Sequence, residues 1–460
     1  GAGVGVGIAW LGLDTLVTFI GRLTNRATEI ALDGRVLGFA TATATLAALV
    51  FAAIPRLPHA GVTPTIDPAN GRTTDGTISK RVQRALVVAQ VAVSFVLLAG
   101  AGLLGRTLLA VQSVDPGFET DSVLTMEIPT GFGTRSLPEI RTFYDEILRQ
   151  VLVVPGVRDA AVGTTVPLAP ERDLFPLMEV SFAGQVIPPG QPVPRVDFRT
   201  VSPSYFETLG IQLLSGRSFD ATDGPDNRRV VIVNRSLADR FFPNADPIDR
   251  RLSWSDPLMR NMLGSDPLTI VGIVEDSKNE GLDRDVPPAV FLPFAQFSMA
   301  NSLFVRASGD ALAITSPVRA IIRALDPTQP IENVMPLERI ATESVAPRRL
   351  NAALIGGFAL LALTIAAVGV FSVLAFSVHQ RTREFGIRSA LGAGPSAISG
   401  TVLREGVLLA GSGLMFGGLA AAGLSRSLQG FLFGVSAVDP ATYLLVGALL
   451  AGVAGMAAWL

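Results

Sequence analysis

The chain has no cysteine, and its 460 residues include only two histidines and two lysines. The lack of cysteine excludes disulfides, thiolate metal sites and cysteine nucleophiles, and two histidines leave almost no basis for histidine-based chemistry. Charge is also scarce, because 17% of the residues are charged, against about 25% in ordinary soluble domains. A net charge of −2 gives no basic footprint for nucleic acid, so no such partner is expected.

Apolar residues take the place of charge and make up 49% of the chain. Near-chargeless runs of about 20 residues, long enough to cross a hydrocarbon core of about 30 Å as helix, recur six times. They lie at 1–20, 36–54, 85–109, 351–378, 406–424 and 441–460. We therefore expect an integral membrane α-helical bundle of about six transmembrane helices. Since apolar runs occupy both ends, we expect a fragment of a longer protein, and the first run lacks the basic flank of a signal peptide.

Residues 110–349 have a different composition, rich in proline, aspartate, arginine and asparagine, with no run long enough to span a membrane. Strand-like and helix-like patterns alternate there, with strands expected at 230–233 and 268–274 and helices at 137–154, 236–242 and 311–325. This alternation predicts a large inserted α/β (α+β) domain with its own core, or two.

The basic residues of the short loops predict the orientation in the membrane. The linker 55–84 and the loop 379–404 carry more basic than acidic residues, as cytoplasmic loops do. A count of six helices places both on the same side. The domain at 110–349 is then expected on the outer side.

The sequence shows no catalytic, cofactor-binding or metal site. There is no P-loop motif, so this chain is not expected to be an ATPase or another enzyme. Ser277 beside Lys278 could form a nucleophile–base pair, but adjacent side chains in a strand or turn point apart, which favours an ordinary polar loop. Carboxylates are expected to be solvated or to cap helices. They include Asp220, Asp223, Asp226, Glu275 and Asp276.

The apolar runs contain few polar side chains, which argues against ion-coupled transport. Arg106 is expected to snorkel to the outer interface, and Gln90 to hydrogen-bond to a neighbouring helix. Small residues favour close helix contacts. They occur at Gly413 and Gly417, at Gly100 and Gly102, and at Gly356 and Gly357.

The most informative segment follows the fourth apolar run, at 381–393. Glu384 and Arg388 stand four residues apart, in the favourable order for an ion pair on a helix. Phe385 and Ile387 add a small apolar surface. A positive-inside anchor explains the arginines but not the glutamate, the phenylalanine and the glycines together, so a partner contact stays open beside it.

This segment resembles a known signature. The run Arg383-Glu384-Phe385-Gly386-Ile387-Arg388, followed by Ala-Leu-Gly-Ala at 390–393, resembles the cytoplasmic loop of the MacB/FtsX-like permeases of ABC transporters. The segments 114–118 and 201–211 resemble that family's periplasmic domain. The closest similarity is to the duplicated permease subfamily common in acidobacteria, which fuses two four-helix units in one chain.

The resemblance implies a division of the chain in a multi-pass protein of the cell inner membrane. Residues 1–54 would be the last two helices of a truncated first unit, and 55–84 a cytoplasmic linker. A transmembrane helix at 85–109 would lead into a MacB-like periplasmic core domain at 110–349. Residues 350–460 would supply the three helices of an FtsX-like permease domain, with a coupling loop at 379–404.

The resemblance also implies a function, namely the permease subunit of an ABC-type export or mechanotransmission transporter. A separate cytoplasmic ATPase would drive the motion of the periplasmic domain, and Arg383, Glu384, Phe385, Gly386, Ile387 and Arg388 would contact that ATPase. Other implied partners are membrane lipid, a periplasmic adaptor, and the missing N-terminal permease unit or a second copy. A membrane-anchored periplasmic sensor or enzyme and an ion-coupled secondary transporter stay open as alternatives.

Overall fold

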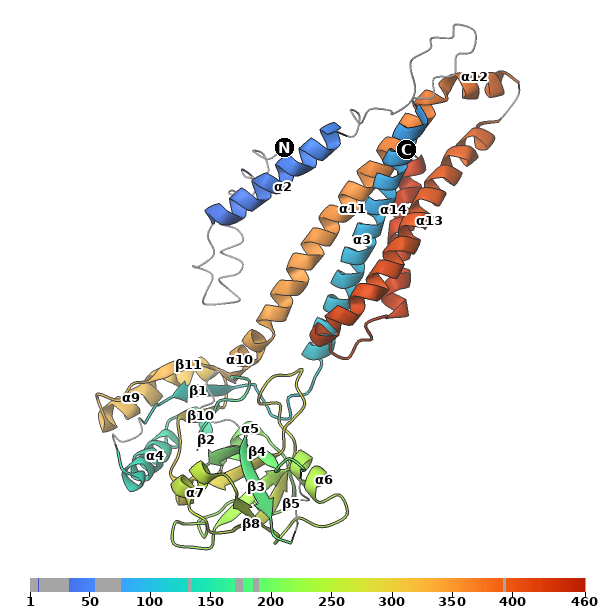
Figure 1. Ribbon diagram of the computed structural model, residues 1–460. Helices are drawn as coiled ribbons and strands as arrows, with labels where there is room; N and C mark the ends of the chain where they lie inside the picture. Colours follow the sequence, from blue (N-terminus) through green and yellow to red (C-terminus); the bar gives the residue numbers. More distant parts are fainter. Residues whose placement is uncertain are drawn as a thin grey trace. The chain divides into compact units, whose positions relative to one another are not determined.

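The computed structural model describes Gly7 and residues 33–53, 76–130, 135–169, 177–184, 190–391 and 394–459. The chain divides into two compact units, one formed by residues 1–111 with 346–460 and the other by residues 112–345. The first unit holds the long helices, and the second holds all the described strands (Figure 1). The second unit is thus inserted in the chain between two long helices, where the sequence predicts a domain at 110–349.

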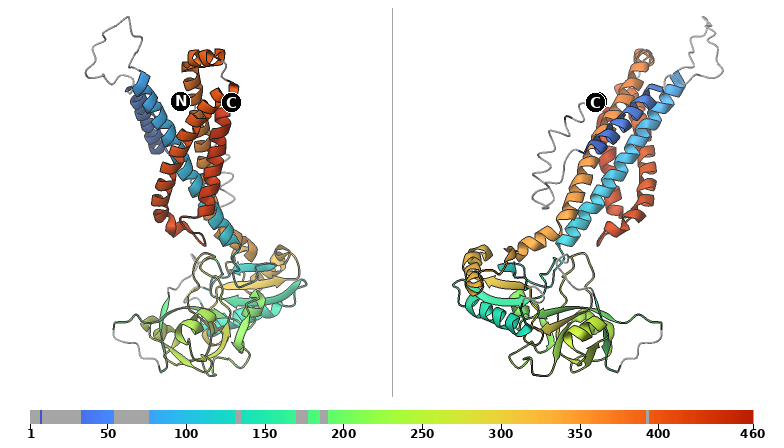
Figure 2. Two further views of the ribbon diagram at one scale, coloured as in Figure 1. Left: turned by 90° about the vertical axis from the view of Figure 1, so that its right-hand side faces the viewer. Right: turned by 60° about the vertical axis from the view of Figure 1, so that its left-hand side comes forward.

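Four described helices of the first unit are long and apolar enough to cross a membrane. They are α3 (Gly76–Gln112), α11 (Ala346–Gln380), α13 (Pro395–Leu428) and α14 (Pro440–Trp459), and they run along one another as a bundle (Figure 2). Three shorter elements complete the described part of this unit. They are α2 (Gly34–Ala53), α12 (Thr382–Ala390) and the single turn η5 (Gln429–Phe431).

The four membrane helices coincide with four of the six apolar runs, those at 85–109, 351–378, 406–424 and 441–460. The run at 36–54 forms the helix α2, which is not among the four spans found in the described residues. The run at 1–20, apart from Gly7, lies outside the described residues. The chain is therefore a membrane protein with at least four apolar helices, and a count of six stays a prediction.

The second unit is built on one mixed sheet of eleven described strands, in the order β11-β1-β10-β2-β4-β3-β7-β8-β6-β9, with β5 paired to β8 (Figure 1). The strands are β1 (Val123–Glu127), β2 (Val157–Gly163), β3 (Met178–Phe182), β4 (Arg195–Val201), β5 (Leu213–Gly216), β6 (Val230–Asn234), β7 (Arg251–Trp254), β8 (Leu268–Val274), β9 (Ala289–Pro293), β10 (Ser302–Ala307) and β11 (Glu332–Pro336). The strands predicted at 230–233 and 268–274 are β6 and β8.

The helices of this unit follow the amphipathic patterns of the sequence. They are α4 (Leu137–Val151), α5 (Tyr205–Leu209), α6 (Arg235–Phe241), α7 (Pro257–Leu263), α8 (Phe294–Phe297), η4 (Ala311–Ile314), α9 (Thr315–Leu325) and α10 (Leu337–Ser344). In α4 the buried residues recur at three-to-four spacing, at Ile140, Tyr144, Ile147 and Val151, so one face of the helix is apolar. The backbone N–H of Ser136 donates to Glu139 at 2.7 Å, which fixes the start of this helix.

The unit has two hydrophobic cores, and the strands that border them are joined where Gly163 of β2 pairs with Val201 of β4. The first core lies between the antiparallel strands β11-β1-β10-β2 and the helices α4 and α9, with Tyr144, Ile147 and Val318 fully buried. The second fills a closed ring of strands, because β9 pairs in parallel with β4 and so joins the two ends of the path β4-β3-β7-β8-β6-β9. The inserted domain therefore contains two hydrophobic cores, one of the two possibilities expected from the sequence.

Candidate functional site at one end of the helix bundle

Two ion pairs of α3 mark the ends of the bundle. Arg84 pairs with Glu405 of α13, and Arg106 pairs with Asp439, which directly precedes α14. Twenty-two residues of helix separate the two arginines, a rise of about 33 Å, close to the thickness of a hydrocarbon core. A bilayer can therefore place each ion pair at one of its surfaces, and we call them the Arg84 end and the Asp439 end.

At the Asp439 end Arg106 has a partner that the sequence did not predict. Its guanidinium binds the Asp439 carboxylate, just outside the start of α14. Asp439 also accepts from the Thr442 hydroxyl at 2.6 Å and from the Thr442 backbone N–H at 2.8 Å, which caps α14. The hydrogen bond from the Thr442 hydroxyl is the main reason that the pKa of Asp439 lies below its ordinary value. The carboxylate thus ties α3 to the start of α14.

Between the two ends, glycines bring α13 against α3. A Cβ on Gly413 would lie 2.6 Å from Val91 Cβ, and one on Gly417 would lie 2.8 Å from Phe95 Cβ. The predicted contact at this pair is therefore made, and it leaves no space for a larger side chain. Gly102 makes a similar contact with Thr442, whereas a Cβ on Gly100, Gly356 or Gly357 would meet no atom within 4 Å.

Gln90 lies against Gly369 of α11, so closely that a Cβ there would clash with its amide oxygen. That oxygen is buried and has no hydrogen-bond donor among the described residues. At this oxygen, a packing contact with a glycine therefore stands where a hydrogen bond to the neighbouring helix was expected. Ser94, one turn further on, does bind α11, because its hydroxyl donates to the Ala362 carbonyl at 2.8 Å.

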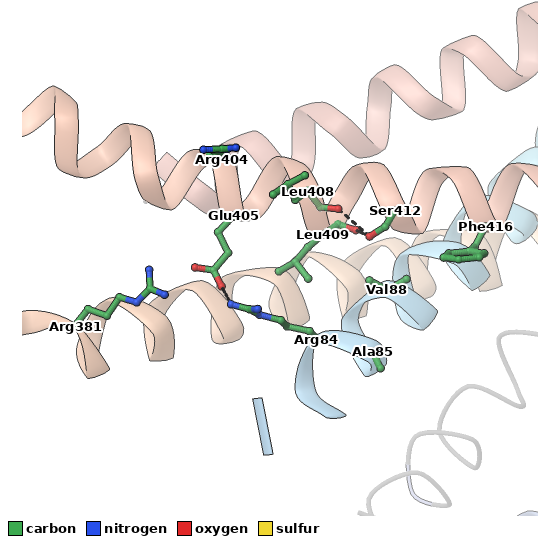
Figure 3. Close-up of a pocket in the computed structure, with 10 residues that line it drawn as sticks. All are labelled: Arg84, Ala85, Val88, Arg381, Arg404, Glu405, Leu408, Leu409, Ser412 and Phe416. Carbon is green, nitrogen blue, oxygen red and sulfur yellow. Dashed lines mark hydrogen bonds and ion pairs between the residues drawn. The ribbon is translucent and has the colours of Figure 1, made fainter. Parts of the chain in front are cut away.

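At the Arg84 end, Glu405 joins three helices through one carboxylate, and Figure 3 shows its pair with Arg84. One oxygen pairs with Arg84 of α3, and the other accepts from the Ser377 hydroxyl of α11 at 2.9 Å. Arg381, which follows α11 directly, lines the same cavity as Arg84 and Glu405. Arg84 in the N-terminal part of α3 and Arg381 just after α11 therefore lie at the same end of the bundle.

The predicted coupling residues lie on α12 at this same end. Glu384 and Arg388 form the expected ion pair at 2.6 Å. Ile387 is 63% exposed and Leu391 83%, whereas Phe385 is only 9% exposed, so its ring packs against the chain itself. A Cβ on Gly386 would meet nothing within 4 Å. The side chain of Arg383 lies outside the described residues.

The polar residues of the second unit that the sequence singled out make ordinary contacts with their neighbours. The Ser277 hydroxyl accepts from Asn279 at 2.8 Å, while Lys278 donates to the Arg284 carbonyl at 2.6 Å, so the two neighbours are separately engaged. Asp276 caps α6, as expected of a carboxylate here. Asp223 and Glu275 instead form ion pairs, with Arg217 and Arg235, and Asp223 is buried rather than solvated. Within the described ranges, no cluster of three or more histidine, aspartate or glutamate residues could hold a metal ion.

The fold defines a multi-pass membrane protein with an inserted domain, and two family models identify it further. The MacB-like periplasmic core domain matches residues 85–320, and the FtsX-like permease C-terminal domain matches residues 356–460. Since the first match alone covers just over half of the chain, the chain belongs to the MacB/FtsX-like family of ABC transporter permeases. The resemblance drawn from residues 383–393 is thus confirmed, while the duplicated subfamily stays a prediction.

Individual relatives align with about half of the chain. The macrolide export ATP-binding/permease protein MacB of Neisseria meningitidis serogroup A is 26% identical over 240 residues, which are 50% of this chain and 35% of that protein. The uncharacterized ABC transporter permease YvrN of Bacillus subtilis is 26% identical over 243 residues, or 50% of this chain and 57% of that protein. The crystal structure of the periplasmic region of MacB from Actinobacillus actinomycetemcomitans aligns with 51% of this chain and 96% of its own, at 12% identity and a TM-score of 0.34. The chain thus spans between about a third and just over half of the two curated relatives.

Proposed function

We propose that this chain is the permease subunit of an ABC-type export or mechanotransmission transporter of the inner membrane, driven by a separate cytoplasmic ATPase. Membership of the permease family supports the class of transporter. The basic bias of the loops 55–84 and 379–404 supports a cytoplasmic Arg84 end and an extracytoplasmic domain at 112–345. A first permease unit or a second copy of this chain would be its partner within the membrane.

The observation that carries the proposal is the short helix α12. It stands between two membrane helices in the chain and exposes Ile387, and Leu391, which directly follows the helix, is exposed four residues further on. A loop that only anchored the membrane helices would need basic residues and no exposed apolar pair. In the proposed complex, these two side chains contact the ATPase, and the Glu384–Arg388 pair stiffens the helix that carries them.

The helices supply a mechanically continuous path from this contact. The helix α11 runs unbroken for 35 residues, about 52 Å, from the first residue after the inserted domain to the residue before Arg381. Close to its end, Ser377 binds Glu405, which also holds Arg84. A displacement of α12 is therefore passed to α3, α11 and α13 together. Two of these, α3 and α11, continue in the chain into the inserted domain.

The roles within α12 then differ from residue to residue. Phe385 packs inward and orients the helix, whereas Ile387 and Leu391 face outward to the ATPase. Gly386 carries no Cβ and has open space beside it, so a partner backbone can approach it closely. We assign Arg383 to the same contact from its place in the signature.

The test uses the full-length protein together with the ATPase that assembles with it. Replacing both Ile387 and Leu391 by serine should weaken ATPase binding by at least about tenfold, because each large apolar side chain buried at a partner contributes about 1.5–3 kcal/mol. The matched control is Val153→Ser, which removes a similarly exposed side chain from the outer domain. Copurification and stimulated ATP hydrolysis at parental levels in the double variant would refute the coupling role of α12.

A further inference from the structure

The Arg84 end contains a cavity of about 590 Å³ between α3 and α13, next to Arg381 (Figure 3). Its charged lining residues are Arg84, Arg381, Arg404 and Glu405. Three guanidinium groups against one carboxylate leave an excess of two positive charges. The cavity is therefore suited to an anion.

The carboxylate of Glu405 is already bound to other groups, so it does not neutralise Arg381 and Arg404. Both oxygens of Glu405 have partners, one in Arg84 and the other in Ser377. In the part of the chain that the structure describes, the side chains of Arg381 and Arg404 make no ion pair or hydrogen bond. Each guanidinium offers five N–H donors in a planar fork that matches the oxygens of a phosphate.

The remainder of the cavity is an apolar track that leads away from these charges along α13. Arg404, Leu408, Ser412 and Phe416 recur at every fourth position and so form one stripe, which rises about 18 Å along the helix. Leu408 is 64% exposed and Phe416 54%, and Val88 of α3 adds a further apolar wall. The Ser412 hydroxyl does not interrupt the track, because it donates back to the Leu408 carbonyl at 2.8 Å.

We propose that this cavity binds an anionic phospholipid, with its phosphate on Arg381 and Arg404 and an acyl chain along Leu408 and Phe416. A soluble phosphate compound would use only the charged end and leave the apolar track empty. An acidic protein segment would have to follow α13 for about 18 Å into the bilayer. A lipid fits both halves, because its charged and apolar parts are joined in the order that the cavity presents. Basic cavities between membrane helices bind anionic headgroups in this way.

The test is native mass spectrometry of the full-length protein, first stripped of lipid and then offered mixed micelles of dioleoylphosphatidylglycerol or dioleoylphosphatidylcholine. The parent should retain phosphatidylglycerol in preference to phosphatidylcholine. Each of Arg381→Gln and Arg404→Gln should lower the retention of phosphatidylglycerol about fivefold, the effect of one basic residue near an anionic headgroup. Arg388→Gln is the matched control, since it removes a positive charge from the same end but outside the cavity.

The apolar half of the cavity is tested separately with Leu408→Ala, which shortens an exposed side chain and keeps the position apolar within the membrane helix. This variant should also retain less phosphatidylglycerol. Glycerol 3-phosphate is offered as the soluble competitor and should not displace the lipid. Equal retention of the two lipids by the parent, equal losses in Arg388→Gln and Arg404→Gln, or full displacement by glycerol 3-phosphate would each overturn the proposal. The proposal would also be overturned if Arg404→Gln retained phosphatidylglycerol like the parent but no longer bound the ATPase.

Discussion

Arg84 of α3 and Glu405 of α13 form an ion pair across 321 residues of sequence. The same carboxylate accepts a hydrogen bond from Ser377 of α11, so three of the four membrane helices are joined at one point. At the other end of α3, Arg106 binds Asp439 and joins this helix to α14. The helix α3 is thus held at both ends by charges, while its middle packs on the glycines of α13.

The first prediction concerns the Arg84–Glu405 pair. Glu405→Arg should destabilise the bundle, because it removes the carboxylate and places a further guanidinium beside Arg84, Arg381 and Arg404. The reciprocal swap Arg84→Glu with Glu405→Arg should recover up to about 1 kcal/mol, a limit set by the half-exposed position of Arg84. Thermal unfolding of the detergent-solubilised protein measures both. If the double variant is no more stable than the single one, the pair does not hold the helices.

The second prediction concerns the glycine contact between α13 and α3. Gly413→Leu and Gly417→Leu should each push the helices apart, because a Cβ at either position already overlaps Val91 or Phe95. Overpacking of this kind costs about 1–3 kcal/mol or more. Gly418→Leu is the control, since a Cβ there meets no atom within 4 Å. After heating, size-exclusion chromatography should show less folded protein for Gly413→Leu and Gly417→Leu than for Gly418→Leu. Equal losses of folded protein in all three variants would contradict the glycine contact.

The third prediction concerns orientation. Because the chain has no cysteine, single cysteines can report on each side of the membrane without background. Asp226→Cys, on the inserted domain, should react with an impermeant thiol reagent in spheroplasts, and Ser389→Cys, on α12, should react only after the membrane is opened. Both positions are exposed. Labelling of Ser389→Cys from outside would reverse the proposed topology and with it the site of ATPase contact.

The fourth prediction concerns the inserted domain. A fragment of residues 112–345 should be soluble and unfold cooperatively, because it contains two hydrophobic cores and forms a compact unit. Near-ultraviolet circular dichroism with thermal or urea unfolding tests this directly. A fragment that aggregates or gives no near-ultraviolet signal would show that the domain needs the membrane helices.

A fifth prediction tests the first of these cores. The Tyr144 hydroxyl is fully buried and donates to the Ile128 carbonyl at 2.7 Å, and burial raises the pKa of Tyr144, so it stays protonated. Tyr144→Phe should cost about 1–2 kcal/mol, because it leaves a buried carbonyl without this donor. Thr142→Val, at an exposed position of the same helix, should change the free energy of unfolding by about 0.5 kcal/mol or less. Equal effects of the two substitutions would contradict the role of this hydrogen bond.

Local patterns in the sequence determined the elements of this protein. Four apolar runs become four membrane helices, and the apolar residues Ile140, Ile147 and Val151, spaced at helical intervals, predict α4 and are buried in it. The segment 383–393 identified the family, and the Glu384–Arg388 pair follows from their spacing on one helix. These features depend on neighbours within a few turns, so the sequence contains all the information that they require.

Tertiary structure decided which distant groups meet. Arg84, Ser377 and Glu405 lie far apart in the sequence, and no motif connects them. The one signal for the Arg84–Glu405 ion pair was the presence of opposite charges at the ends of two apolar runs. The packing of Gly413 and Gly417 on α3 aligns these helices and so brings the charges together. The same holds for Phe385, which the sequence places beside Ile387 but which the fold turns inward. Pairing and burial across helices depend on how the helices are rotated and spaced, and only side chains packed from several segments determine that.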